Sequence, residues 1–430
     1  MKKCLIVSMV LLFACAGGWA QEFKAGAARR DVTPKEPIPM WGYGARHDYP
    51  ATGTKAPLFA KALVLDCGNG KVALVGVDMG RSPTYAMMDA ITAAVKEQSG
   101  VDHVMIVGSH THHGPSIELL DQPGLGKGTW DASVAYSKWL QQQFIDVINE
   151  AAKNTAPAKI GWAVEDTDFN HNRQSHKEPK VREKTLSVLR VDGMDGKPMA
   201  ILANLAAHPV MENIMDRRWS SEWPGVMQGT VEGQLGGTCL FMQGASGDMS
   251  PETKEGSRGV DGFGKAVGTK VIEMANGIQT KVPEHPGIAG NLWSFSGPTR
   301  MDLKNPVVLG TFRQFFYPEL MAMLVEMPDN TITLRGSTLL LNGEIALVGA
   351  AGELFSDLSN RIKAQSPAAV TLVFGYCNGH SLYVPTREAV AEGGYGADAT
   401  MSWLPVGTGE KVVDQAVSDI KKLMDETKTK

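Results

Sequence analysis

The chain has 430 residues, of which 46 are acidic and 42 basic, so its formal net charge is −4 at pH 7. This acidic balance argues against nucleic acid as a partner. The hydrophobic content of 43% is ordinary for a globular protein, and the length suffices for one large domain or two.

The first twenty residues have the pattern of a targeting segment. Two lysines precede an almost wholly apolar run at 4–16, and Gly-Trp-Ala at 18–20 offers a small-residue cleavage site. The run is too short to span a bilayer comfortably. We therefore expect a signal peptide (1–20), an exported product that is periplasmic or secreted, and one mature domain (21–430). Leu-Phe-Ala-Cys also resembles a lipoprotein box, so a lipid anchor on Cys15 is the alternative.

Three cysteines, Cys67, Cys239 and Cys377, remain in the expected mature domain. They are too scattered for a disulfide framework, and no pair has the spacing of a cysteine zinc site.

Apolar runs alternate with helical patterns along the mature chain. Residues 61–67 and 72–78 predict a hairpin across Gly68-Asn69-Gly70, and a second hairpin is predicted around Asn342-Gly343. Further strands are expected at 104–108, 186–192, 199–207, 239–244, 331–341, 344–350 and 370–376, and helices at 85–98, 131–153, 263–275, 354–364 and 410–426. The pattern predicts an α/β fold, a single large domain with a mixed β-sheet flanked by helices.

Polar residues capable of chemistry recur just past the predicted ends of strands. In open α/β sheets this edge is where ligands bind. The residues concerned are Asp78, His110, His208, Asp248, Glu353 and Tyr383.

Among these, His110, His208 and Glu353 form the best candidate metal site. Two imidazoles and a carboxylate suit zinc, and three protein ligands leave a coordination position open for water. Taken singly, each histidine is equally compatible with a structural role, and Glu353 with a place near the first turn of a helix. Their shared position at strand ends favours a metal.

The histidine-rich segment Ser109–Pro115 offers further candidates. His112 is a candidate acid or base, or a second ligand, because Gly114-Pro115 turns the chain here. His113 should point to the opposite side, as a structural or solvent-facing residue. Arg173 is either an oxyanion clamp or an ordinary surface arginine. Ser250 lacks the flanking glycines of a nucleophile elbow and competes with an ordinary turn serine.

These motifs, in their order along nearly the whole mature chain, resemble the catalytic domain of the neutral ceramidases. The members of that family are zinc amidases that cleave the N-acyl bond of ceramide. The matching segments are GAARRDVTP (26–34) with WGYGA (41–45), SHTHHGP (109–115), Asn172-Arg173, AAHPV (206–210), GASGDMSPE (244–252), Gly352-Glu353, GYCNGHSLYVPT (375–386) and Tyr395.

The resemblance implies a role for each matching residue. It implies that zinc is held by His110, His208, Glu353 and Tyr383. It implies that the scissile carbonyl and its oxyanion are handled by His112, Arg173 and Tyr395. Ser250 occupies the family's serine position, where we expect it to shape the site or position the substrate.

The chain departs from the family pattern at several points. His380 replaces a tyrosine near the metal, and the serine motif ends in Glu252 rather than asparagine. The family's additional C-terminal immunoglobulin-like domain has no expected counterpart. These departures leave the metal chemistry intact and bear on the substrate.

The expected function is that of an exported Zn²⁺-dependent amidohydrolase of the ceramidase (N-acylsphingosine) type. Its partner would be a small-molecule or lipid amide, and a lipid substrate would bring peripheral membrane association with it. The alternatives are a zinc esterase or amidase acting on acylated sugars or cell-wall fragments, and a non-catalytic surface lipoprotein.

Overall fold

The computed structural model describes residues 22–46, 49–316 and 329–428, together with Met323, Val325 and Met327. The predicted signal peptide and Cys15 lie outside these residues, so the expected export stays a prediction. Among the described helices, none is long and apolar enough to cross a membrane.

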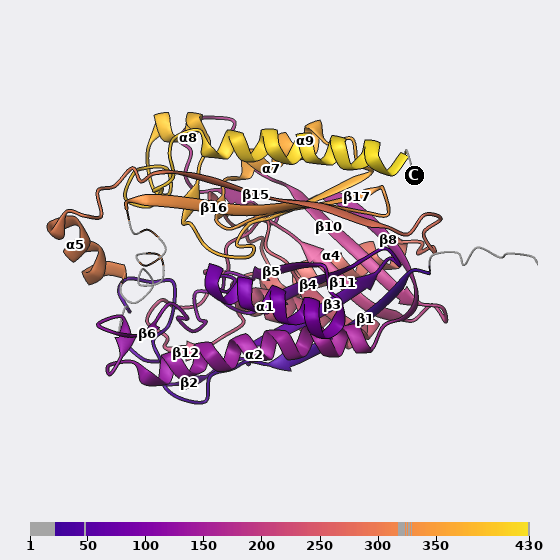
Figure 1. Ribbon diagram of the computed structural model, residues 1–430, viewed down its shortest axis with the longest axis horizontal. Coiled ribbons are helices and arrows are strands. Elements are labelled where there is room, and N and C mark those ends of the chain that lie inside the picture. Colours follow the sequence, from indigo (N-terminus) through magenta and orange to yellow (C-terminus); the bar gives the residue numbers. More distant parts are fainter. Residues whose placement is uncertain are drawn as a thin grey trace, which may run out of the picture.

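Two β-sheets pack face to face between outer layers of helices (Figure 1). The larger sheet has eight strands, of which only the β13–β11 and β4–β5 neighbours are parallel. Its strands, in spatial order, are β13 (Thr238–Phe241), β11 (Pro198–Asn204), β10 (Thr185–Gly193), β8 (Ala156–Asp166), β1 (Lys24–Asp31), β3 (Phe59–Asp66), β4 (Lys71–Val77) and β5 (His103–Gly108).

The smaller sheet has four strands and is also mixed. Only its β17–β19 neighbours are parallel. In spatial order its strands are β15 (Ile288–Pro298), β16 (Thr331–Leu341), β17 (Ile345–Ala350) and β19 (Val370–Phe374).

Helices cover the outer face of each sheet. On the larger sheet, α2 contacts β1 and β3 and packs against α1, while α3 and α4 cover the other half. On the smaller sheet, α7 and α9 form the opposite outer layer (Figure 1). The helices are α1 (Tyr85–Ser99), α2 (Asp131–Lys153), α3 (Glu222–Leu235), α4 (Gly259–Gly277), α5 (Pro306–Phe316), α7 (Ser356–Gln365), α8 (Arg387–Glu392) and α9 (Thr408–Lys428).

The alternation of side-chain direction along each strand produces this layering. In β3, Ala62 and Val64 face the helices, whereas Leu63 and Leu65 face the smaller sheet. Successive side chains of a strand point to opposite faces, so a strand that is apolar at every position needs a cover on both sides. The continuous apolar runs therefore indicate strands buried on both faces.

Four short ladders lie outside the two sheets and shape the loops at their edges. They are β2 (Gly53–Thr54) with β12 (Arg218–Trp219), β6 (Leu120–Pro123) with β7 (Gly126–Lys127), β9 (Asn170–Asn172) with β14 (Met249–Pro251), and β18 (Glu353–Leu354) with β20 (Tyr383–Val384).

The predicted mixed sheet with flanking helices is confirmed, and both predicted hairpins are present. The strand expected to end directly at His208 is wrong in its boundary, because β11 ends at Asn204 and the chain leaves the sheet before the histidine. The division of the strands into two sheets was not predicted, since the apolar pattern shows burial on both faces but not what provides the cover.

Candidate metal centre and active site

The loops that follow strands of both sheets meet at one buried cluster. His110 follows β5, His208 follows β11, and Glu353 lies in the short strand β18 beyond β17. The segment after β19 docks on the edge of β5, where the Asn378 amide bonds the backbone of Val104 and Ile106. This contact places residues that follow the smaller sheet beside the histidines that follow the larger one.

His110 and His208 face each other through their Nε2 atoms, which lie 3.0 Å apart. The Nδ1 of His110 lies 2.6 Å from the carbonyl oxygen of Gly80, and the Nδ1 of His208 lies 2.7 Å from that of Ser246. A carbonyl only accepts, so both Nδ1 atoms carry the proton and both Nε2 atoms present lone pairs. A cation placed between the two rings could bind both lone pairs.

The Glu353 carboxylate completes this arrangement. Its Oε2 lies 3.5 Å from the Nε2 of both His110 and His208. The hydroxyl of Tyr376 donates to the same oxygen at 3.2 Å and lies 3.0 Å from the Ser246 hydroxyl. Carboxylates next to a metal are commonly oriented by such hydrogen bonds.

His112 lies on the accessible side of the cluster. Its Nε2 is 3.3 Å from the Nε2 of His110, and its ring packs against Trp41 and Tyr43 at centroid distances of 5.1 and 4.7 Å. His110, His112 and His208 together form a group whose ligand atoms are close enough to hold a metal ion. Hence His112 is placed either to bind the metal or to act beside it.

Arg173 reaches the cluster from the opposite side. Its Nη2 donates to the Nε2 of His208 at 2.9 Å, to the Gly247 carbonyl at 3.0 Å and to the Tyr383 hydroxyl at 3.2 Å. The Tyr395 ring lies 5.9 Å from the guanidinium and 5.5 Å from the Tyr383 ring. Because Tyr395 is 59% exposed, it marks the mouth of the site.

Burial and charge set the protonation of the cluster. Burial, and then the neighbouring histidines, hold the pKa of His112 well below its usual range. Burial, and then Arg173, lower the pKa of His208 to about 3. Burial acts to raise the pKa of Glu353, but His110 and His208 outweigh it and hold that pKa well below the usual range. His112 and His208 are therefore neutral imidazoles beside a carboxylate anion at neutral pH.

Two residues of the cluster have left-handed backbone conformations. His110 has φ 70° and Tyr376 has φ 53°, which are uncommon values for residues other than glycine. Such conformations cost about 1–3 kcal/mol each and persist only where the surrounding structure enforces them. They occur here at the chain reversals that direct both rings into the site.

The structure brings together six of the predicted site residues, namely His110, His112, His208, Arg173, Glu353 and Tyr383. Tyr395 lies at their edge. Ser250 lies in β14, paired with His171, and no contact among the described residues joins its side chain to the histidines. His113 is buried, and its Nε2 lies 3.2 Å from the Asn213 carbonyl oxygen. Of the two roles predicted for it, the structural one is confirmed and the solvent-facing one is wrong.

Sequence reasoning missed Tyr376 and Trp41. Tyr376 stacks on His110 at a centroid distance of 4.0 Å and bonds the carboxylate, whereas Tyr383 contacts Arg173. Trp41 meets His110, His112 and His380 edge-on. The position of Tyr376 two residues after β19 is the same signal that identified the other candidates.

No family model matches the chain. Among solved structures, it is similar to a ceramidase complexed with C2, with a TM-score of 0.74 and 18% identity over 94% of this chain and 76% of that one. It is also similar to the neutral ceramidase from Pseudomonas aeruginosa, with a TM-score of 0.70 and 18% identity over 94% of this chain and 75% of that one. The chain has the fold of these proteins.

Proposed function

We propose that this chain is an exported zinc-dependent hydrolase that cleaves an amide bond. The observation that carries the proposal is that the Nε2 atoms of His110 and His208 face each other at 3.0 Å, and that each lies 3.5 Å from the buried Glu353 carboxylate. The shared fold with two ceramidases supports the reaction class, and the apolar segment at 4–16 supports export.

The donor set fits zinc. His110, His208 and Glu353 would hold the ion, with the Tyr383 hydroxyl as a further ligand. Two imidazole nitrogens and one carboxylate are a donor set found at catalytic zinc sites. A zinc ion held there supplies Lewis-acid polarisation of a carbonyl and lowers the pKa of water to about 7. Tyr376 would act on the ligands by fixing the Glu353 carboxylate.

His112 is proposed as the residue that moves the proton. Its lowered pKa keeps the imidazole neutral at neutral pH, so the ring can accept a proton from the attacking water. Protonated by that step, it can donate to the departing amine. Gly42, whose added Cβ would lie 2.6 Å from the His112 ring, leaves the space that this orientation needs.

Arg173 is proposed to stabilise the oxyanion, together with Tyr395, whose ring lies 5.9 Å from the guanidinium. The guanidinium is a hydrogen-bond donor held beside the histidine pair, with its Nη2 2.9 Å from the Nε2 of His208. Donors that are already fixed in a buried site stabilise developing negative charge without reorganisation. Tyr395 would contact the substrate where it enters.

The proposal is tested on the purified mature protein by metal analysis together with turnover. About one zinc per chain is expected, together with hydrolysis of ceramide or of another N-acyl substrate from a panel that includes O-acyl esters. Chelation should abolish the activity, Zn²⁺ should restore it, and His110→Ala should lose most of the metal. Activity that survives complete metal removal would refute the mechanism. Mass measurement of the mature N-terminus distinguishes cleavage before Gln21 from lipidation of Cys15.

A further inference from the structure

The strand β15 forms one edge of the smaller sheet, and no strand among the described residues pairs with its outer side. Its 11 residues include no charged side chain, and its ladder with β16 is continuous from Ile288 to Pro298. Native proteins usually protect a free edge with charges, bulges, proline or a covering segment, because its unpaired backbone groups bind other strands. A long, uncharged and regular edge is therefore a surface suited to strand pairing.

Every second residue of β15 directs its backbone N–H and carbonyl away from β16. At the start of the strand, both groups of Ile288 bond the Asn69 side chain, outside the ladder. The backbone of Gly287 instead bonds Asn342, which directly follows β16. Because the two orientations alternate in an antiparallel ladder, the outward groups belong to the even-numbered residues. Among the described residues, no hydrogen-bond partner reaches the outward backbone groups of Gly290, Leu292, Ser294 and Ser296.

This row of outward groups is open to solvent and has definite ends. Leu292 is 80% exposed, and Ser294 and Ser296 are exposed as well. Asn69 occupies the groups of Ile288 at one end, and Pro298 has no N–H to offer at the other. The free edge is thus the stretch from 290 to 296, with residue 293 at its centre.

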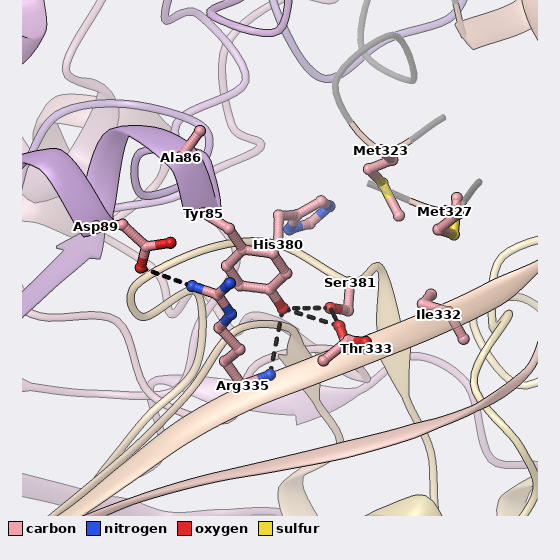
Figure 2. A pocket seen from close by; sticks show the side chains of 10 residues that line it. All are labelled: Tyr85, Ala86, Asp89, Met323, Met327, Ile332, Thr333, Arg335, His380 and Ser381. Carbon is pink, nitrogen blue, oxygen red and sulfur yellow. Dashed lines mark hydrogen bonds and ion pairs between the residues drawn. The ribbon is translucent and has the colours of Figure 1, made fainter. Parts of the chain in front are cut away.

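Side chains close two other edge positions of the same sheet. Figure 2 shows one of them, where β16 extends past the end of β17. There the Tyr85 hydroxyl donates to the Thr333 carbonyl at 3.0 Å and accepts from the Arg335 backbone N–H at 3.2 Å. On β19, the Asn204 amide donates to the Val373 carbonyl at 3.2 Å. The free edge of β15 has no such cover from the described residues.

A second copy of β15 supplies the extended backbone that this edge lacks. Two copies that run antiparallel, with Trp293 on the two-fold axis, place Leu292 of each copy opposite Ser294 of the other. Gly290 then lies opposite Ser296, so every outward group finds a partner. No like charges meet along the uncharged strand, and the two Leu292 side chains become diagonal neighbours on one face.

The side chains of the other face are already used within one copy. Trp293 and Phe295 pack in the core that α9 covers, so pairing leaves them in place. The interface therefore needs no rearrangement of the chain.

We propose that two copies of this chain associate through the free edges of β15, which joins their smaller sheets into one continuous sheet. The backbone groups of 290–296 hold the copies together, and Leu292 is the side chain that becomes buried. The inference concerns assembly and is independent of the proposed reaction.

The test measures the mass of the purified mature protein by sedimentation velocity over a range of concentrations. The wild type should form a species of twice the chain mass that dissociates on dilution. Ser294→Pro removes one outward N–H and places a ring on the outer side, while the ladder with β16 does not use that N–H. This variant should be monomeric at concentrations where the wild type is dimeric, with an unchanged circular dichroism spectrum.

Leu292→Lys provides a second variant that keeps every backbone group. It should weaken association by at least about tenfold, because an apolar contact is lost and two ammonium groups meet beside the axis. Val307→Lys is the matched control, since Val307 of α5 is 75% exposed and lies outside β15. It should leave association unchanged.

A wild type that sediments as a monomer at every concentration would overturn the inference. So would a folded Ser294→Pro protein that remains dimeric, since its interface must then lie elsewhere. If that variant does not fold, the two lysine variants decide, and equal association of Leu292→Lys and Val307→Lys would count against β15.

Discussion

The imidazoles of His110 and His208 point their Nε2 atoms at each other across 3.0 Å, while both Nδ1 atoms lie against backbone carbonyls. When each Nδ1 donates to its carbonyl, the Nε2 of the neutral ring is left as an acceptor. The two carbonyls thus fix the tautomers that a metal requires, and Glu353 supplies the negative charge that a cation needs.

The first prediction separates proton transfer from metal binding at His112. His112→Gln should keep its zinc while kcat falls by roughly 10²–10⁴-fold, the usual contribution of a positioned acid or base. Metal analysis and steady-state kinetics on the same preparation measure both quantities. His113→Gln is the matched control and should keep both zinc and most of kcat, because His113 bonds a backbone carbonyl away from the cluster.

Loss of zinc from His112→Gln would contradict this assignment. It would make His112 a ligand, which the close grouping of the three histidines also allows.

The second prediction concerns the space beside His112. In Gly42→Ala the new Cβ would lie 2.6 Å from the ring, and φ at this position is +104°, so the loop or the ring must move. Misplacing a catalytic group by about 1 Å can cost about 10²-fold in rate. We expect kcat to fall by at least tenfold with zinc retained.

Gly229→Ala in α3 is the control for this substitution, because nothing lies within 4 Å of its added Cβ. It should leave kcat unchanged and stabilise the fold by up to about 1 kcal/mol. Equal kinetic effects of the two substitutions would show that His112 does not depend on this space.

The third prediction concerns Tyr376, which donates to Glu353. Tyr376→Phe keeps the buried ring and removes the hydroxyl that orients the carboxylate. Zinc affinity, measured by competition with a chelator, should weaken by about 10–100-fold. Tyr136→Phe removes a buried hydroxyl bound to the Val32 carbonyl and should cost about 1 kcal/mol of stability with no change in zinc affinity. Equal zinc affinities in the two variants would assign Tyr376 to packing alone.

The fourth prediction is a pH dependence of stability that originates at His113. Burial, and then the charge of Arg46, lower the pKa of His113 from 6.5 to about 4. The unfolded chain therefore takes up this proton first as the pH falls, so the contribution is fully present above pH 6.5 and is lost towards pH 4. The loss amounts to at most about 3 kcal/mol.

Denaturant unfolding at several pH values between 4 and 7 measures this loss. Relative to the wild type, His113→Gln should show a shallower fall in unfolding free energy over the same range. Parallel curves for the two proteins would exclude His113 as the origin.

The sequence predicted regular elements well and irregular ones poorly. The bounds of α2 were predicted correctly, because 23 residues without glycine or proline keep one helical period. By contrast, β1 and β15 were missed, since both are rich in glycine, alanine or serine and gain their strand character from neighbours. The helix α3 was missed for a similar reason, because its sequence contains a proline and three glycines.

The part of the site that lies at strand ends could be predicted from the sequence. His110, His208 and Glu353 each follow a strand. The rule that ligands bind at this edge of a sheet predicted that the three residues lie together. The contact between Tyr376 and Glu353 could not be predicted, because it depends on a left-handed backbone conformation that no residue pattern indicates. Likewise, nothing in the sequence indicates that the Asn378 amide joins the smaller sheet to β5.

The side chains of the proposed metal centre come from both sheets. This determines when the centre can form during biosynthesis. His110 and His208 follow strands of the larger sheet, whereas Glu353 and Tyr376 follow strands of the smaller one, later in the chain. A growing chain therefore exposes its histidines long before it has the carboxylate that completes the set. On the proposed function, metal capture would be the closing event of folding, and ion occupancy would report that the two sheets have docked.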